Sequence, residues 1–285
     1  MNSKKDPMGR AIADYWKTKK AERLRVFSPM FEEDEIPLQT LFRKYEDMPD
    51  IELKALDMAK GKTLDVGAGA GCHSLVLQEK GFDVTAIDIS PLSVQAMKER
   101  GVKNVLEQDF FTLKGQYDTI LMLMNGIGIV GTLERLPKFF RQLDNILAPG
   151  GQVLCDSSDI SYVFEDENGM IDIPNEMDYY GEHSFRMQYK DTIGEPFDWL
   201  YIDGGPSGKS RNSSAAGPTW TTGRCSRRSC RSGTPCGSSA NDFPVKKDRL
   251  RTEAGPCRSG VSSGSVHNPG FPGRSFRCER GSPSS

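Results

Sequence analysis

Three glycines at alternate positions and one carboxylate beyond them are the residues of this 285-residue chain whose spacing suggests chemistry. Gly67, Gly69 and Gly71 follow the short apolar run 63–66, and Asp88 stands 17 residues after the last glycine. Glycine lets the backbone turn sharply and approach a ligand closely, because no Cβ intervenes. A carboxylate about 20 residues beyond the first glycine can accept both hydroxyl hydrogens of a ribose. The pattern indicates a site for a nucleoside-bearing cofactor.

The spacing of the glycines distinguishes between cofactors. A dinucleotide site seats a pyrophosphate on the following helix and usually shows Gly-x-Gly-x-x-Gly. Here the pattern is Gly-x-Gly-x-Gly, and Asp65 stands two residues before the first glycine. A carboxylate at that position suits a ligand with an ammonium group better than one with phosphates. The combination favours S-adenosylmethionine over NAD, and it weakens the alternative of an ordinary strand-to-helix turn.

Five segments resemble, in order, the motifs of the class I S-adenosylmethionine-dependent methyltransferases. The run 64–71 is similar to that family's first motif, and Asp88 to its ribose-binding acid. Residues 108–110 resemble the third motif, whose acid usually meets the adenine amino group. Residues 117–125 resemble the fourth strand, which ends beside the reactive methyl, and residues 147–151 resemble the turn before the fifth strand.

The resemblance covers about Asp6 to Asp203, and the flanks 6–9 and 179–182 look like those of small bacterial members. It implies an enzyme that transfers a methyl group from S-adenosylmethionine to an unidentified acceptor by in-line displacement, without a metal. The cofactor-binding residues that it implies are Asp65, Gly67, Ala68, Gly69, Gly71, Asp88, Ile89, Asp109, Phe110 and Asn125.

Short apolar runs alternate with amphipathic stretches, which predicts an α/β, Rossmann-like, doubly wound and mostly parallel sheet with N-terminal helices. The runs 119–123 and 152–155 are nearly continuously apolar, as expected for strands covered on both faces. Ser90 and Pro91 predict the start of a helix that Gly101 ends. Cofactor and substrate should lie at the carboxyl ends of the first, second and fourth strands of this sheet.

A second helix is predicted from residues spaced by three and four. Pro137 belongs in its first turn, after a bend over residues 132–136. The residues expected on its sheet-facing side are Leu133, Leu136, Phe140, Leu143 and Leu147.

Residues 1–58 are expected to form a helical cap, because helical apolar periodicity is mixed with charges in 10–25 and 38–58. Such a segment could close over the cofactor and present Tyr15 and Trp16 to it. The alternative, which we favour, is that these aromatic side chains pack the helices onto the sheet.

Methyl transfer needs a base only when the acceptor carries a proton at its working pKa. His73 is expected in the first turn after the glycine loop, where packing or capping is the favoured role. Glu182 and His183 could line an acceptor pocket, or they could form the solvated edge of a hairpin that pairs 182–189 with 197–202. Asn125 could orient an acceptor or contact the cofactor through its backbone. We assign no catalytic base.

The composition changes abruptly near Asp203. Of the 82 residues 204–285, 49 are Ser, Gly, Arg or Pro and only seven are Ile, Leu, Val or Phe. So few large apolar groups cannot offset the entropy of ordering, so a disordered, low-complexity tail is predicted after an incomplete methyltransferase domain at 59–203. The tail carries 14 Lys or Arg against four Asp or Glu, which leaves 23 against 35 in residues 1–203.

The tail also holds five of the seven cysteines, without any Cys-x-x-Cys pair, so neither a zinc site nor a disulfide framework is expected. A GC-rich coding sequence translated out of frame gives this composition. Our hypothesis is that the tail is such a frameshift product, and that the family's C-terminal helix and last strands are missing.

No basic leader begins the chain and no apolar run reaches 18 residues, so a cytoplasmic protein is expected, neither secreted nor membrane-spanning. The two cysteines of residues 1–203 fit a reducing compartment. Tail arginines could attract nucleic acid, but stacking partners are sparse, which disfavours such a partner. The alternatives to a methyltransferase are an NAD(P)-dependent oxidoreductase and a cofactor-binding remnant without turnover. The sequence does not indicate an oligomeric state.

Overall fold

The computed structural model describes residues 3–20, 22–166, 168–174 and 177–202. All of these residues belong to one compact unit of the chain. The predicted tail at 204–285 lies outside the described residues. The same holds for any helix and strands that would follow position 203.

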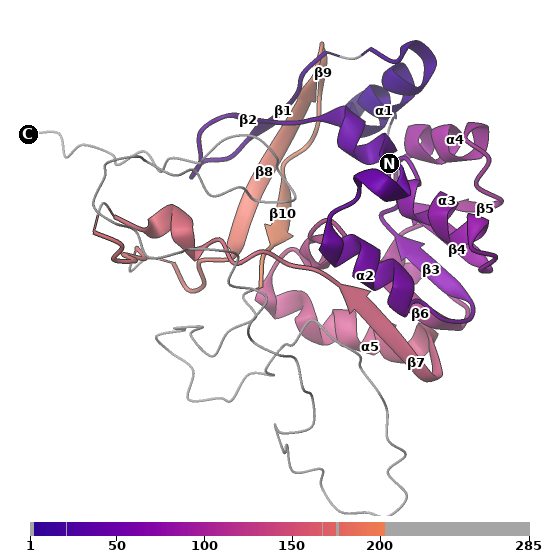
Figure 1. The fold of residues 1–285 in the computed structure, drawn as a ribbon. Coiled ribbons are helices and arrows are strands. Elements are labelled where there is room, and N and C mark those ends of the chain that lie inside the picture. Colours follow the sequence, from indigo (N-terminus) through magenta and orange to yellow (C-terminus); the bar gives the residue numbers. More distant parts are fainter. Residues whose placement is uncertain (1–2, 21, 167, 175–176, 203–285) are drawn as a thin grey trace, which may run out of the picture. The chain divides into compact units, whose positions relative to one another are not determined.

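The glycine loop follows the central strand of a five-stranded parallel sheet with the strand order β5-β4-β3-β6-β7 (Figure 1). Its strands are β3 (Thr63–Val66), β4 (Val84–Asp88), β5 (Asn104–Glu107), β6 (Tyr117–Met122) and β7 (Leu147–Cys155). The chain runs outward from β3 to β5 and then returns to the other side of β3. This reversal places the topological switch point between β3 and β6, where ligands of open α/β sheets bind.

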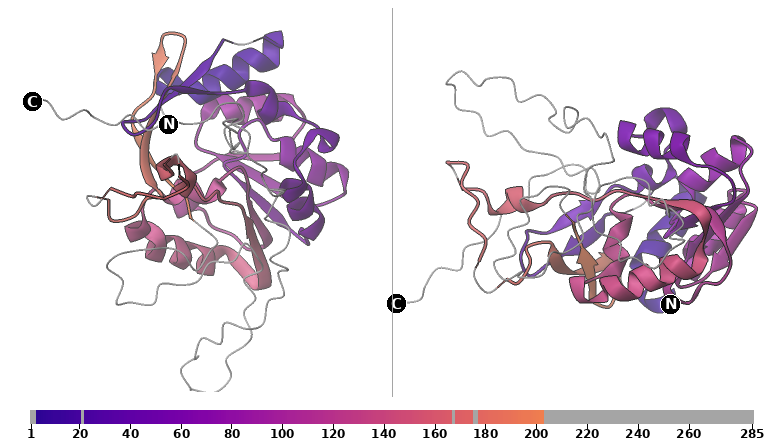
Figure 2. Two further views of the ribbon diagram at one scale, coloured as in Figure 1. Left: turned by 60° about the vertical axis from the view of Figure 1, so that its left-hand side comes forward. Right: turned by 90° about the horizontal axis from the view of Figure 1, so that it is seen from below.

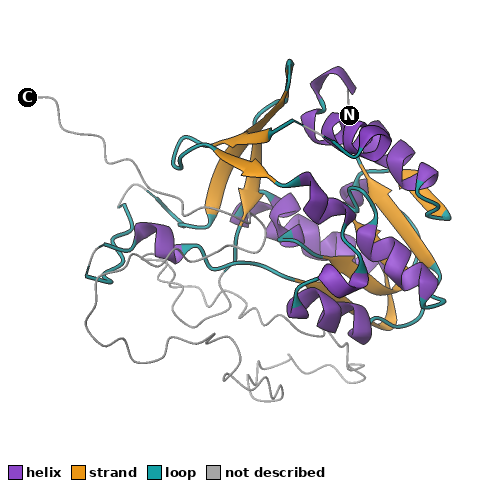
Figure 3. Cartoon of the chain, turned by 45° about the horizontal axis from the view of Figure 1, so that its top comes forward, coloured by secondary structure: helices purple, strands orange, loops and turns teal. Residues whose placement is uncertain are grey.

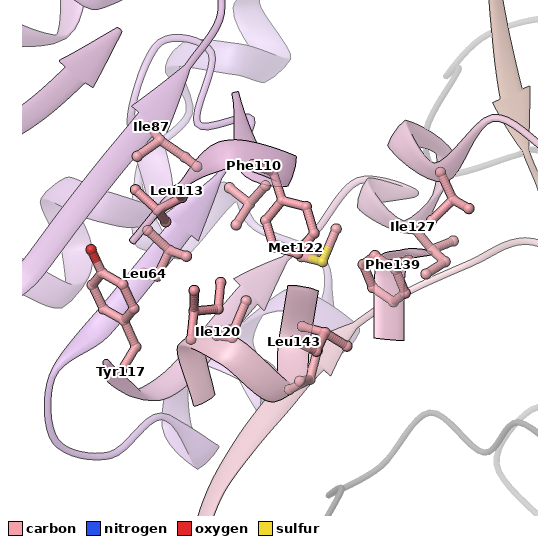
Figure 4. Packing of buried hydrophobic residues seen from close by; sticks show 14 of the residues in the cluster. Leu64, Ile87, Phe110, Leu113, Tyr117, Ile120, Met122, Ile127, Phe139 and Leu143 are labelled. Atoms are coloured by element: carbon pink, nitrogen blue, oxygen red, sulfur yellow. The ribbon is translucent and has the colours of Figure 1, made fainter. Parts of the chain in front are cut away.

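Helices cover both faces of this sheet (Figure 2), which confirms the Rossmann-like, doubly wound fold. On one face lie α2 (Asp50–Met58), α3 (Cys72–Glu79) and α4 (Pro91–Glu99). On the other face lies α5 (Leu136–Ile146), whose Phe139 and Leu143 pack with strand residues such as Ile120 and Met122 (Figure 4). β3, β4 and β6 are almost entirely buried, as their apolar runs predict.

The predicted helix starts are confirmed. The Ser90 hydroxyl oxygen accepts a hydrogen bond from the Ser93 N–H at 2.9 Å and so caps α4, and Gly101, at φ +94°, follows its end. Pro137 lies in the first turn of α5, after a 3-10 turn over Leu133–Arg135.

The predicted sheet-facing side of α5 is wrong at both ends. Leu133 precedes the helix and is 37% exposed, and Leu147 already belongs to β7. The apolar residues that α5 buries are Leu136, Phe139, Leu143 and Ile146. These positions keep the three- and four-residue spacing, but after Leu136 the next buried apolar residue is Phe139 and not Phe140. Phe140 lies at the edge of the buried face of α5 and is only half-buried.

A second, antiparallel sheet has the order β10-β8-β1-β2, with β9 paired to β8 (Figure 3). Its strands are β1 (Leu24–Phe27), β2 (Asp34–Ile36), β8 (Glu182–Tyr189), β9 (Thr192–Ile193) and β10 (Phe197–Leu200). The predicted hairpin is confirmed, because Phe197 pairs with Phe185 and Leu200 with Glu182. β8 is an inner strand between β10 and β1, so the solvated-edge alternative is wrong.

Residues 1–58 are not wholly helical, contrary to the expectation. Helix α1 (Pro7–Thr18) ends where Lys19 adopts a left-handed conformation, and β1 begins five residues later. Two 3-10 turns, Leu38–Phe42 and Tyr45–Asp47, then precede α2. β1 pairs with β2 and, on its other side, with β8, which is more than 150 residues away. Local periodicity does not show the pairing with β8. No helix among the described residues combines the length and apolarity that a membrane crossing requires.

Candidate functional site

The glycine loop after β3 leaves an open cradle. Gly67 and Gly69 have φ angles of +66° and +57°, in the left-handed region where side chains are strained. A Cβ on Gly67 would meet nothing within 4 Å, and one on Gly69 would only reach atoms 4.0 Å away. A Cβ on Gly71 would instead lie 3.0 Å from Met97 of α4. The first two glycines therefore leave room for a ligand, whereas Gly71 permits close helix packing.

Asp88 lies at the carboxyl end of β4, next to this loop. Its two carboxylate oxygens accept hydrogen bonds from the backbone N–H groups of Gly69 and Ser90, each at 2.9 Å. These bonds fix the orientation of the carboxylate and leave each oxygen a free lone pair. Burial raises the pKa of Asp88 to about 6, and the nearby carboxylates of Asp6 and Asp65 add to the rise.

A cavity of about 240 Å³ lies at the carboxyl ends of β3, β4 and β5. Five of the predicted cofactor-binding residues line it, namely Gly67, Asp88, Ile89, Asp109 and Phe110. Ile89 is 51% exposed, whereas Phe110 is buried. The wall thus combines the Asp88 carboxylate, for which the sequence predicts a ribose contact, with apolar surface that suits a flat base.

The other predicted cofactor-binding residues, Asp65, Ala68, Gly69, Gly71 and Asn125, do not line this cavity. Asp65 is buried and faces α3, where its Oδ2 accepts a hydrogen bond from the Ser74 hydroxyl at 2.6 Å. Burial raises its pKa. Asp65 thus holds the start of α3 against β3, beneath the glycine loop. A direct contact of Asp65 with a cofactor remains a prediction.

His73 belongs to a buried ion-pair network. Its Nε2 lies 2.7 Å from Oε2 of Glu52, which also pairs with Arg43. Burial alone would lower the pKa of His73, but interactions with Cys72, then Glu52 and Asp65, raise it well above its usual value. Through its pair with Glu52, this histidine joins α2 to α3, and it does not line the cavity. Of the two roles expected for His73, packing is therefore confirmed, whereas capping is wrong, because among the described residues no side chain caps α3.

The turn after β6 contains two consecutive left-handed residues, Met124 at φ +62° and Asn125 at φ +58°. Asp156, the residue after β7, accepts hydrogen bonds from both backbone N–H groups, at 3.1 and 2.8 Å. The side-chain oxygen of Asn125 accepts from the Ser158 N–H at 2.7 Å. The Asn125 side chain is therefore used within the fold, and Asp156 is a supporting residue that the sequence analysis missed. An acid directly after the fifth strand was its only sequence signal.

Replacing Asp156 by alanine should lower the free energy of unfolding by about 2 kcal/mol, because two N–H groups lose their acceptor beneath a strained turn. Urea denaturation at pH 7.5 measures this difference. Asp172→Ala, at an exposed position, is the matched control. Equal effects of the two substitutions would show that Asp156 does not hold the turn.

Glu182 and His183 lie on the second sheet, and neither lines the cavity. Oε1 of Glu182 accepts a hydrogen bond from the Leu133 N–H at 2.6 Å, so it anchors the turn before α5. His183 is 4% exposed, its Nε2 lies 2.7 Å from the Tyr180 carbonyl oxygen, and burial lowers its pKa to about 4. Its ring packs 4.6 Å from that of Phe31. An acceptor pocket built on these two residues remains a hypothesis.

The aromatic pair of α1 packs on Phe42, which belongs to the 3-10 turn Leu38–Phe42. Tyr15 also packs against buried residues of the antiparallel sheet, so the favoured role in packing is supported for this residue. The ring centres of Tyr15 and Trp16 lie 4.7 and 6.4 Å from that of Phe42. Neither residue lines the cavity. A contact of either ring with the cofactor is therefore not supported by this arrangement.

Several residues that line the cavity were not predicted. Gln108 is the first residue of the third motif and Phe111 follows it, so their adjacency to Asp109 and Phe110 was an available signal. Arg135 and Ile129 come from the segment between β6 and α5, for which the sequence offered no motif. The other unpredicted lining residues are Val66 and Ile87.

Comparisons with known proteins agree with this geometry. A family model described as a methyltransferase domain matches residues 39–191, more than half of the chain. A crystal structure of an S-adenosylmethionine-dependent methyltransferase from Bacteroides fragilis, in complex with S-adenosyl-L-homocysteine, is 57% identical, with a TM-score of 0.67. The match covers 71% of this chain and 83% of that one.

Two curated relatives are more distant. A putative methyltransferase, YqeM, from Bacillus subtilis is 32% identical over 117 residues, which is 38% of this chain and 47% of that protein. A 23S rRNA (uracil(747)-C(5))-methyltransferase from Pyrococcus abyssi is 32% identical over 108 residues, which is 35% and 26% of the two chains. The chain thus spans less than half the length of these relatives, and none of the comparisons favours the oxidoreductase alternative. With its glycine loop, its doubly wound sheet and these matches, the chain belongs to the class I S-adenosylmethionine-dependent methyltransferase family.

Proposed function

We propose that this protein binds S-adenosylmethionine in the cavity beside the glycine loop and catalyses transfer of its methyl group to an acceptor. One observation carries the proposal more than any other. The carboxylate of Asp88 is fixed by two backbone N–H groups next to two glycines that leave open space. This arrangement provides acceptors for two sugar hydroxyl groups and room for the adjoining chain of the cofactor.

The residues present fit that cofactor. Asp88 would accept the two ribose hydroxyl hydrogens, because each of its oxygens keeps a free lone pair. Ile89 and Phe110 would enclose the adenine ring, and Asp109, exposed at the cavity, would accept from its amino group. Gly67 and Gly69 would let the backbone approach the part of the cofactor beyond the ribose. The predicted contacts of Asp65, Ala68, Gly71 and Asn125 would then support the loop or act through backbone atoms.

The bound cofactor supplies a methyl group on a sulfonium sulfur, which is a good leaving group. The protein's contribution is to hold the acceptor in line with that methyl and to exclude water. Neither His73, which pairs with Glu52, nor His183, whose Nε2 is held by a carbonyl oxygen, lines the cavity. The arrangement therefore supports catalysis by positioning, with no base assigned.

We infer a small-molecule acceptor in preference to a nucleic acid. The excess of acidic residues in 1–203, 35 against 23 basic ones, supports this because it would repel a phosphate backbone. The rRNA methyltransferase among the relatives keeps a nucleic-acid acceptor open as the competing class. We further infer a reducing, cytoplasmic location, which the free thiols of Cys72 and Cys155 support.

Calorimetry with S-adenosylhomocysteine and NADH, added separately to the full chain, tests the proposed cofactor. We expect binding of the first and none of the second. Binding of NADH alone would refute the proposal. Transfer of a labelled methyl group to candidate small molecules then distinguishes an enzyme from a remnant that binds the cofactor without turnover.

The affinity for S-adenosylhomocysteine should fall as the pH drops through about 6. A protonated Asp88 keeps fewer acceptor positions, and at pH 5 only about a tenth of the protein has this group ionised, so we expect roughly tenfold weaker binding than at pH 7.5. Because the pKa of Asp88 is higher in the folded than in the unfolded protein, the free energy of unfolding of the ligand-free protein falls as the pH rises through 6. Hydrogen bonds from the hydroxyl groups of a bound ligand would stabilise the ionised carboxylate and so offset this loss. Titrations between pH 5 and 8 measure the midpoint, and a flat profile would contradict this role.

A further inference from the structure

Helix α1 joins the cofactor site through a single buried carboxylate, that of Asp6. Asp6 is fully buried at the N-cap of α1. Its Oδ1 accepts a hydrogen bond from the Gly9 N–H at 2.8 Å, which caps its own helix. Its Oδ2 accepts from the Ser90 hydroxyl at 2.5 Å, and Ser90 is the N-cap of α4. One side chain thus ties the starts of two helices that are 84 residues apart in sequence.

The chain of hydrogen bonds continues from Ser90 to the ribose position. The Ser90 N–H donates to Oδ1 of Asp88 at 2.9 Å, and the Gly69 N–H donates to Oδ2 of the same carboxylate. Gly9, Asp6, Ser90, Asp88 and Gly69 therefore form one continuous network. It runs from α1 to the glycine loop and contains the carboxylate that would hold the sugar.

Packing beside this network is tight. A Cβ on Gly9 would lie 2.2 Å from both Oδ2 of Asp6 and Oγ of Ser90, so only glycine fits. Ile12, one turn further along α1, is fully buried against Ala70 of the glycine loop and Ala96 of α4. A movement of α1 would therefore disturb the loop and the network together.

We propose that Asp6 is a positioning residue for the ribose-binding carboxylate, so that docking of α1 and binding of the cofactor are energetically coupled. This inference rests on the proposed function. Asp6 acts through Ser90 on the orientation of Asp88, and its negative charge acts directly on the protonation of Asp88. The charges of Asp6, from the cap of α1, and Asp65, from β3, raise the pKa of Asp88. Asp109, which follows β5, and Arg135, which precedes α5, are the other charged residues that line the same cavity. Removing the charge of Asp6 or Asp65 should make Asp88 easier to ionise.

The decisive variant is Asp6→Asn, because asparagine is an equally good N-cap and preserves shape. Binding of S-adenosylhomocysteine is measured by calorimetry between pH 4.5 and 8. We expect the pH midpoint of binding to move down by about 0.5 to 1 unit relative to the wild type. Asp14→Asn is the matched control on the same helix, since Asp14 pairs with Lys190 at 2.7 Å and takes no part in the network. Its midpoint should stay at the wild-type value.

Hydrogen exchange of the wild-type protein provides a measurement that needs no variant. Bound S-adenosylhomocysteine should slow exchange of the α1 amides by at least about threefold if docking and binding are coupled. An unchanged midpoint in Asp6→Asn, or unchanged exchange in α1 on binding, would overturn the inference. Failure of the wild type to bind S-adenosylhomocysteine would instead refute the proposed function.

Discussion

Gly67→Ala should weaken S-adenosylhomocysteine binding by about 100-fold while the protein stays folded. The residue adopts φ +66°, and the new methyl group would project into the open space of the cavity. Overpacking of a close contact costs up to about 3 kcal/mol, which corresponds to roughly this factor in affinity. Calorimetry at pH 7.5 measures the loss.

The backbone strain that alanine introduces at a left-handed position needs a control, and Gly81→Ala provides it. Gly81 has φ +88°, and a Cβ there also meets nothing within 4 Å, but the residue lies beyond α3, away from the cofactor cavity. Both variants should lose about 1 kcal/mol of unfolding free energy. Only Gly67→Ala should lose affinity, so equal affinities would place the ligand elsewhere.

Asp88→Asn is the second variant with a large expected effect. An amide has one acceptor oxygen, and its NH₂ group would face one of the two N–H donors that now bind the carboxylate. Loss of charge-assisted hydrogen bonds costs about 1.5–3 kcal/mol, so affinity at pH 8 should fall by roughly 10- to 100-fold. The dependence of binding on pH near 6 should disappear as well.

Asp83→Asn makes the same chemical change just before the opposite end of β4, at an exposed position. It should leave both the affinity and the pH midpoint at their wild-type values. If Asp88→Asn kept the wild-type midpoint, another group would have to control the pH dependence, and Asp88 would not be the ribose acid.

Features set by short stretches of sequence were predictable. The glycine loop, Asp88 and the Ser90 cap each depend on a few adjacent residues, since backbone conformation and capping are local. The hairpin of β8 and β10 was also predictable, because its two runs are close in sequence. These features were sufficient to indicate the fold and the cofactor class.

Features set by packing between distant segments were not predictable. β1 pairs with the nearby β2 and also with the distant β8, and nothing within residues 1–58 reveals the second partner. Asp65 faces α3 because β3 alternates its side chains between two covered faces. Arg135 reaches the cavity, and Asp6 reaches Ser90, only through the placement of α5 and α1. Spacing along the chain carries no signal for such contacts.

The most direct test of the central claim is a crystal structure of the full chain with S-adenosylhomocysteine bound. We expect the ribose hydroxyl groups on the Asp88 carboxylate, the adenine ring beside Ile89 and Phe110, and the remaining chain of the ligand passing Gly67. A ligand bound at another place, or a cavity left empty at saturating concentration, would contradict the central claim.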